Sequence, residues 1–103
     1  MSEEPMGPSW DGGVVLDIGA DVGALVLYTS ASMLGREIEL IPDHSDVART
    51  HSAVRARELP HGRSFAAVYP HVTSGNYGVE GSHQRVVITG GRVTEVIFDA
   101  ATA

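Results

Sequence analysis

Five histidines carry the most reactive side chains of this sequence, because imidazole is both a general base and the commonest neutral metal ligand. They are His44, His51, His61, His71 and His83, in a chain without cysteine. Their spacing matches neither a His-x-His pair nor the His-Glu-x-x-His motif of zinc enzymes. Loops at one end of a β-structure could still bring His44, His71 and His83 together. A metal-binding module that uses these three loop histidines is therefore one hypothesis for the function.

Hydrolysis would need a hydroxyl nucleophile with a base beside it. The chain has many serines and histidines, but it lacks the Gly-x-Ser-x-Gly motif that presents an activated serine. It also lacks the Gly-x-x-x-x-Gly-Lys phosphate loop, and all seven of its basic residues are arginine. A small hydrolase is therefore the weaker alternative, and we expect no catalytic residues and no cofactor.

Short β-strands are the elements that must position these side chains. Apolar or alternating runs recur roughly every ten residues, separated by glycine, proline, asparagine and aspartate. The expected strands cover residues 14–18, 22–29, 36–41, 51–58, 63–69, 76–80, 84–89 and 92–98. No stretch has the pattern of an amphipathic helix of three turns. The sequence predicts an all-β fold, a single β-sandwich of about seven to eight antiparallel strands of the immunoglobulin-like or prealbumin-like kind.

Two connections carry specific turn signals. Gly90-Gly91 lies between two apolar runs, which is typical of a two-residue hairpin because a type I′ turn needs positive φ at both positions. Gly19-Ala20-Asp21 is also turn-forming, so it is expected to join the strands at 14–18 and 22–29 as a hairpin.

Charged residues mark one face of two predicted strands. Glu37 and Glu39 alternate with apolar residues in one strand, and Arg55 and Arg57 do so in the next. If the two strands are neighbours, these glutamates and arginines pair across the sheet. We expect them to form a solvated face opposite the core.

The strand pattern defines one domain at residues 14–98. Residues 1–13 are rich in proline and glycine, which oppose both helix and strand, and are expected to form a flexible N-terminal tail. Trp10 in this tail is expected to dock on the domain, with contact to a partner as the alternative. Residues 99–103 are expected to form a frayed C-terminus.

Composition narrows the functional class. The 103 residues suit a single domain, and 13 acidic against 7 basic residues give a formal net charge of −6. That balance argues against binding to nucleic acid or to an anionic membrane surface, since both need a basic face. The acidic first residues and the lack of a long apolar run predict a soluble, cytoplasmic protein.

One segment resembles a known β-sandwich family. Phe65 to Val79 has an apolar strand, a short connection and then Gly75-Asn76-Tyr77 at the start of the next strand. This pattern resembles carboxypeptidase regulatory-like and other transthyretin-like modules, and the resemblance implies a fold, not an activity. The Tyr-Arg-Gly-Ser motif of the hydroxyisourate hydrolases is missing, so their activity is not implied. The longer run from Val15 to Thr94 resembles a family of small actinobacterial proteins, which implies no activity either.

The sequence favours a non-catalytic binding or assembly module. A complete set of β-strands without a catalytic motif supports this interpretation. Because the edges of a small sheet can pair between subunits, a homodimer through sheet edges is the expected assembly. The ligand, whether protein or small molecule, is not indicated.

Overall fold

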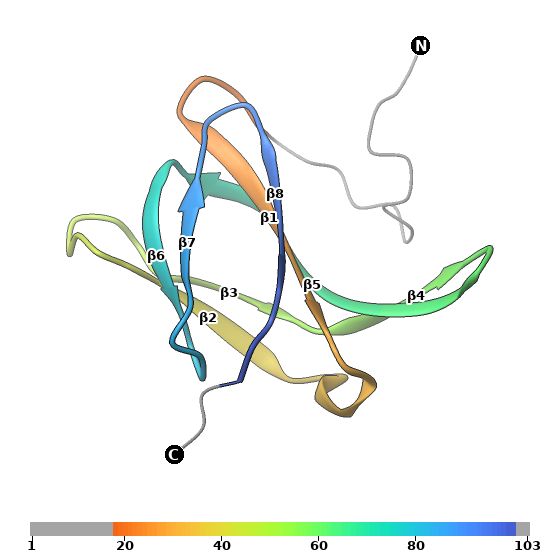
Figure 1. Ribbon diagram of the computed structural model, residues 1–103. Coiled ribbons are helices and arrows are strands. Elements are labelled where there is room, and N and C mark those ends of the chain that lie inside the picture. Colours follow the sequence, from red (N-terminus) through yellow and green to blue (C-terminus); the bar gives the residue numbers. More distant parts are fainter. Residues whose placement is uncertain (1–17, 101–103) are drawn as a thin grey trace, which may run out of the picture.

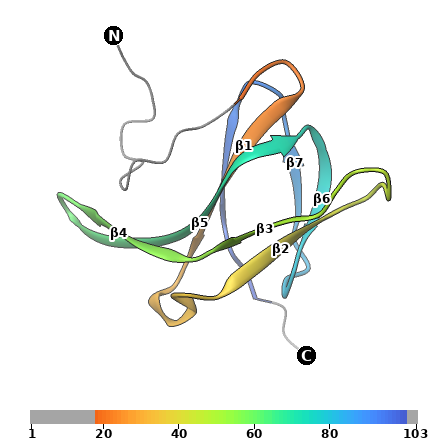
Figure 2. The same cartoon turned by 180° about the vertical axis from the view of Figure 1, so that it is seen from behind.

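A computed structural model describes residues 18–100, and in this range the fold is all-β (Figure 1, Figure 2). The strands form two four-stranded sheets, sheet A in the order β4-β5-β1-β8 and sheet B in the order β3-β2-β6-β7. The elements are β1 (Val22–Thr29), the 3-10 helix η1 (Ala31–Met33), β2 (Glu37–Pro42), β3 (Thr50–Ala53), β4 (Arg55–Leu59), β5 (Gly62–Thr73), β6 (Gly75–Val79), β7 (Arg85–Ile88) and β8 (Val93–Ile97). The predicted all-β, two-sheet architecture is confirmed. No helix in residues 18–100 is long and apolar enough to cross a membrane.

Sheet A is built around β1, the most apolar strand of the fold. β1 pairs antiparallel with β5 on one side and parallel with β8 on the other. β4 extends the sheet beyond β5 as an antiparallel edge strand, and in Figure 1 the β4–β5 hairpin reaches away from the two-sheet body. The parallel pairing of β1 with β8 departs from the antiparallel pattern expected for all strands.

The turn at Gly90-Gly91 leads the chain from sheet B into sheet A, where β8 pairs with β1. The expected type I′ hairpin between the two flanking strands is wrong, because β7 lies in sheet B and β8 in sheet A. The N–H of Arg92 donates to the carbonyl of Thr89 (3.2 Å) while the chain crosses between the sheets. Gly91 has a φ of +76°, whereas a Cβ at Gly90 would lie 1.9 Å from the carbonyl oxygen of Ala20. Gly90 is thus needed for close backbone packing, not for a hairpin.

Two of the connections between the sheets are so short that they leave the flanking strands almost continuous. The single strand expected at 51–58 is interrupted at Val54, whose buried side chain enters the core while its N–H donates to the carbonyl of Arg36 (2.8 Å). As a result β3 pairs with β2 in sheet B and β4 pairs with β5 in sheet A. Only Ser74 separates β5 from β6, which pair in different sheets in the same way. The two sheets therefore enclose one common core.

The core between the sheets is filled by alternate residues of both. It consists of Leu25, Leu27, Ile38, Leu40, Val54, Ala67, Tyr69, Val72, Tyr77, Val79, Val86 and Ile88. The two buried tyrosines satisfy their hydroxyl groups with backbone carbonyls. Tyr69 donates to Ile38 (2.7 Å) and Tyr77 donates to Thr73 (2.6 Å). Their rings can therefore be buried without an unsatisfied polar atom.

The expected pairing of Glu37 and Glu39 with Arg55 and Arg57 is wrong. The glutamates lie on β2, which pairs with β3, and the arginines lie on β4 in the other sheet. Glu39 instead forms an ion pair with Arg49 (3.3 Å). Arg57 does not lie on a solvated face either, since only 9% of it is exposed.

The ends of the predicted domain are covered only in part by the described residues. The tail expected at 1–13 and most of the strand expected at 14–18 lie outside them, as do residues 101–103. Ile18 is described and is not part of a strand. Asp99 and Ala100, expected in a frayed end, are held in place: Ala100 forms a bridge with Ser82, and the N–H of Asp99 donates to Gln84 Oε1 (2.7 Å).

Candidate binding pocket

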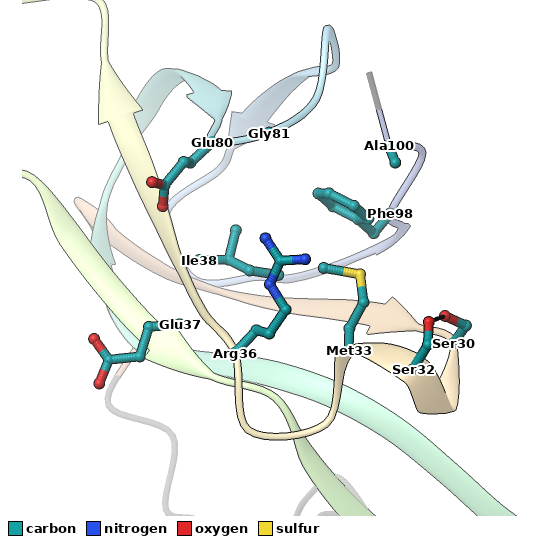
Figure 3. Close-up of a pocket in the computed structure, with 10 residues that line it drawn as sticks. All are labelled: Ser30, Ser32, Met33, Arg36, Glu37, Ile38, Glu80, Gly81, Phe98 and Ala100. Carbon is teal, nitrogen blue, oxygen red and sulfur yellow. Dashed lines mark hydrogen bonds between the residues drawn. The ribbon is translucent and has the colours of Figure 1, made fainter. Parts of the chain in front are cut away.

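A pocket of about 570 Å³ opens where η1, the start of β2, the β6–β7 turn and the residues after β8 come together (Figure 3). Its volume falls within the range of small-molecule sites, roughly 300–1,000 Å³. The lining mixes polar and apolar side chains: Ser30, Ser32, Met33, Arg36, Glu37, Ile38, Glu80, Gly81, Phe98 and Ala100.

Arg36 places its guanidinium group at the centre of the lining side chains (Figure 3). Its backbone is fixed on both sides, because its N–H donates to Met33 (2.9 Å) and its carbonyl accepts from Val54 (2.8 Å). Gly35 makes the turn from η1 into β2 with a φ of +85°, a conformation that favours glycine. Among residues 18–100, no carboxylate lies within ion-pair distance of the Arg36 guanidinium. Its charge is therefore available to a ligand.

Apolar side chains surround this guanidinium group. Figure 3 shows Ile38 on one side of it and Met33 and Phe98 on the other. Ile38 is buried and belongs to the core, while Met33 and Phe98 pack against that core and stay partly exposed. The N–H of Phe98 donates to the carbonyl of Tyr28 (2.8 Å), which fixes the backbone that carries the ring. The pocket thus offers a cation next to apolar side chains.

Two carboxylates lie near the pocket, and each is directed elsewhere. Glu80 Oε1 accepts a hydrogen bond from the N–H of Glu39 (2.9 Å), and Glu37 points away from the pocket in Figure 3. Below the pocket, burial and, to a lesser degree, the negative charge of Glu80 raise the pKa of the Tyr69 hydroxyl. Because Glu80 also lines the pocket, its carboxylate opposes a ligand that brings much negative charge.

Ser30 and Ser32 add hydroxyl groups at the edge of the pocket. Their Oγ atoms form a hydrogen bond with each other (2.7 Å). None of the five histidines is among the described residues that line the pocket, so neither serine has an imidazole base at this site. The hydroxyls are suited to hydrogen bonding with a ligand oxygen.

The predicted metal ligands lie on three separate elements. His44 is exposed in the loop after β2, His71 is on β5 and not in the loop where it was expected, and His83 precedes β7. His83 lines a smaller pocket of about 290 Å³ together with Asp99. Within residues 18–100, no group of three or more histidines, cysteines or carboxylates could hold a metal ion. The structure does not bring His44, His71 and His83 together.

The pocket residues were not predicted from the sequence. The sequence predicts that Arg36 begins one strand and that Glu80 and Phe98 end two others. One local feature of the sequence points to this site. Arg36 follows Gly35 at the start of an alternating strand, which puts a cation beside a turn. Nothing in the spacing of residues 30–38, 80–81 and 98–100 shows that they meet.

Comparisons of this chain with protein-family models, curated proteins and solved structures find no match. The resemblance to transthyretin-like modules therefore stays a prediction. The function is therefore argued from the geometry of the pocket.

Proposed function

We propose that this protein is a non-catalytic binding module whose pocket takes a small ligand with a carboxylate next to an apolar group. The observation that carries the proposal is the Arg36 guanidinium, which has no carboxylate partner in the described range and lies between Ile38, Met33 and Phe98. A guanidinium group binds a carboxylate through two parallel N–H···O bonds. The apolar side chains supply the contact area that a small ligand needs.

The charges around the pocket favour a ligand with a single negative charge. Among the described residues that line the pocket, Arg36 is the one basic residue, and Glu80 lies on the same rim. A carboxylate is balanced by the single guanidinium. A phosphate group carries nearly two charges, so it would be repelled by Glu80 more strongly than a carboxylate.

Binding, not catalysis, fits the chemistry of the lining. The hydroxyl groups of Ser30 and Ser32, the two among the described lining residues, pair with each other, and an activated hydroxyl would need a base within hydrogen-bond reach. The hydrogen bond from Glu39 holds Glu80 to the backbone of β2. We assign these residues to ligand contact and assign no reaction to the pocket.

The experiment is a calorimetric titration with two probes that differ only in charge, 3-phenylpropionate and 3-phenylpropionamide. The carboxylate is expected to bind and the amide to bind much more weakly. Loss of hydrogen bonds to a charged group costs about 1.5–3 kcal/mol, so Arg36→Gln should weaken carboxylate binding on the order of 10- to 100-fold.

Arg92→Gln is the matched control, because Arg92 is an exposed arginine outside the pocket. It should leave the affinity for the carboxylate unchanged. Equal affinity of the two probes, or equal effects of the two arginine variants, would contradict a carboxylate site at Arg36. Nuclear magnetic resonance shifts of the Met33 methyl group on titration would locate the probe independently.

We also propose that the module assembles as a homodimer through the β4 edge of sheet A. β4 pairs on one side with β5, and the β4–β5 hairpin reaches away from the body (Figure 1). An edge strand has backbone N–H and C=O groups that can pair with a second chain. Size-exclusion chromatography with light scattering should give twice the chain mass of 10.9 kDa. A monomer at all concentrations would contradict the proposed dimer and would leave the proposed ligand site unaffected.

A further inference from the structure

The chain at the end of β8 forms one wall of the pocket, and the Gln84 side chain holds this wall as a neighbouring strand would. Gln84 Nε2 donates to the carbonyl of Ile97 (2.7 Å), and Gln84 Oε1 accepts from the N–H of Asp99 (2.7 Å). These two backbone groups lie on either side of Phe98, which lines the pocket. Gln84 itself is not among the described lining residues, so its influence on a ligand would pass through this wall.

Further hydrogen bonds tie the same wall to two other parts of the fold. The N–H of Phe98 donates to the carbonyl of Tyr28 near the end of β1 (2.8 Å). The hydroxyl of Ser82, in the turn between β6 and β7, donates to the carbonyl of Asp99 (2.8 Å). The backbone that carries the Phe98 ring is therefore fixed before a ligand arrives. A preorganised contact avoids much of the ordering cost of binding.

The Phe98 ring is the aromatic surface of the pocket. It is the one aromatic ring among the described residues that line the pocket, and it is partly exposed. A Cβ at Gly81 would lie 3.7 Å from Phe98 Cζ, so the tip of the ring reaches the β6–β7 turn. Met33 lies on the same side of the Arg36 guanidinium as this ring (Figure 3). A phenyl ring attracts a second aromatic ring beyond the apolar area that the pair buries, and a thioether also makes favourable contacts with such a ring.

Given the proposed carboxylate site at Arg36, on which this inference rests, we propose that the apolar group of the ligand is an aromatic ring, which Phe98 selects. The ligand class is then an aryl-substituted monocarboxylate, with its carboxylate on Arg36 and its ring against Phe98 and Met33. A saturated ring of similar size would fill the same space but lacks the π-system that favours stacked or edge-to-face pairs. Gln84 is the positioning residue that holds Phe98 in place.

The experiment is a calorimetric titration with 3-phenylpropionate and 3-cyclohexylpropionate, which share the carboxylate and the linking chain and differ in the ring. The readout is the ratio of the two affinities. Because this ratio is compared between protein variants, the different hydrophobicity of the two probes cancels. Phe98→Leu keeps an apolar side chain and removes the ring, so the preference for the phenyl probe should fall roughly 2- to 10-fold.

Phe65→Leu is the matched control. Phe65 is, like Phe98, partly buried and packed against the core, but it is not among the described residues that line the pocket. It should leave the ratio unchanged, with circular dichroism showing both variants folded. An unchanged ratio in Phe98→Leu, or an equal fall in both variants, would overturn the aromatic selection and leave the carboxylate site intact. Binding of both probes that Arg36→Gln does not weaken would instead overturn the proposed function, and the aromatic selection with it.

Gln84→Ala tests the positioning role. This substitution releases the backbone on both sides of Phe98 and leaves the ring in the chain, so the affinity ratio should fall in the same direction as in Phe98→Leu. In the double variant, Gln84→Ala should cause no further fall, because both substitutions act through the same ring. A further fall in the double variant, or an unchanged ratio in Gln84→Ala alone, would overturn the role given to Gln84.

Discussion

The Tyr69 hydroxyl donates a 2.7 Å hydrogen bond to the backbone carbonyl of Ile38, and this bond connects the two sheets through the core. Tyr69 lies on β5 of sheet A and Ile38 on β2 of sheet B. The ring of Tyr69 is buried, so the bond is made where water cannot replace it. Ile38 also lines the pocket, which places this bond directly beneath the candidate site.

Removing this bond should destabilise the fold. Tyr69→Phe leaves a buried carbonyl without that donor, which costs about 1–3 kcal/mol of unfolding free energy. Urea unfolding followed by circular dichroism would measure the loss. Tyr77→Phe is the matched control, because its hydroxyl bonds within a corner, to Thr73 four residues earlier. We expect a smaller loss there, and an unchanged stability of Tyr69→Phe would contradict the role given to this bond.

Stability should fall when the pH rises above about 10, the ordinary pKa of tyrosine. Burial raises the pKa of Tyr69 and of Tyr77, and burial with the charge of Glu95 raises that of Tyr28. A raised pKa in the folded state means that the unfolded chain releases its tyrosine protons first. The stabilisation is thus complete below pH 10 and is lost as the pH rises toward the folded-state values.

The composition makes this alkaline experiment unusually clean. The chain has no lysine, and arginine keeps its charge through this range. Tyrosine is therefore the side chain that titrates there. The unfolding free energy of Tyr69→Phe should depend less steeply on pH than that of the unmodified protein, and tyrosinate absorbance would follow the ionisation. Identical slopes would show that Tyr69 does not contribute.

Gly90→Ala should be strongly destabilising. The new Cβ would lie 1.9 Å from the carbonyl oxygen of Ala20, so backbone must move, at a cost of the order of 3 kcal/mol. Gly19→Ala is the control, since its Cβ would meet nothing within 4 Å. Thermal unfolding should show a large loss for the first variant and little change for the second. Equal melting temperatures would contradict the close packing at the crossover turn.

Addition of Zn²⁺ or Ni²⁺ should leave the melting temperature unchanged. His44, His71 and His83 lie on separate elements, and residues 18–100 contain no group of three metal-binding side chains. A ligand that binds the folded state raises its stability by mass action. A metal-dependent rise that disappears in His71→Ala would restore the histidine hypothesis.

Most strands could be predicted because their signal is local. The alternation around Ile38 and Leu40 predicts a strand with one buried face, and both side chains are in the core. Pairing is not local. The pair Gly90-Gly91 is compatible with a hairpin and with a turn that crosses between the sheets. The packing of Gly90 against Ala20, about 70 positions away in the sequence, distinguishes the crossing turn from the hairpin.

The candidate site could not be predicted for a similar reason. Arg36 is charged and follows a glycine, which is also true of Arg63 and Arg92 on this chain. What distinguishes Arg36 is that Phe98 and Glu80 are brought to it by sheets that close over one core. The burial of Arg57 could not be predicted either, because an alternating pattern marks the face of a strand without showing how exposed that face is.

The parallel pair of β1 and β8 has a consequence for synthesis of the protein in the cell. Ala24 pairs with Val93, so partners in the centre of sheet A are 69 residues apart. Such a contact closes a long loop, which makes folding slow compared with folds of local contacts. On the ribosome, β1 must wait with one side unpaired until β8 has been translated and has left the exit tunnel. During that interval its apolar edge is exposed to nascent-chain chaperones and to aggregation.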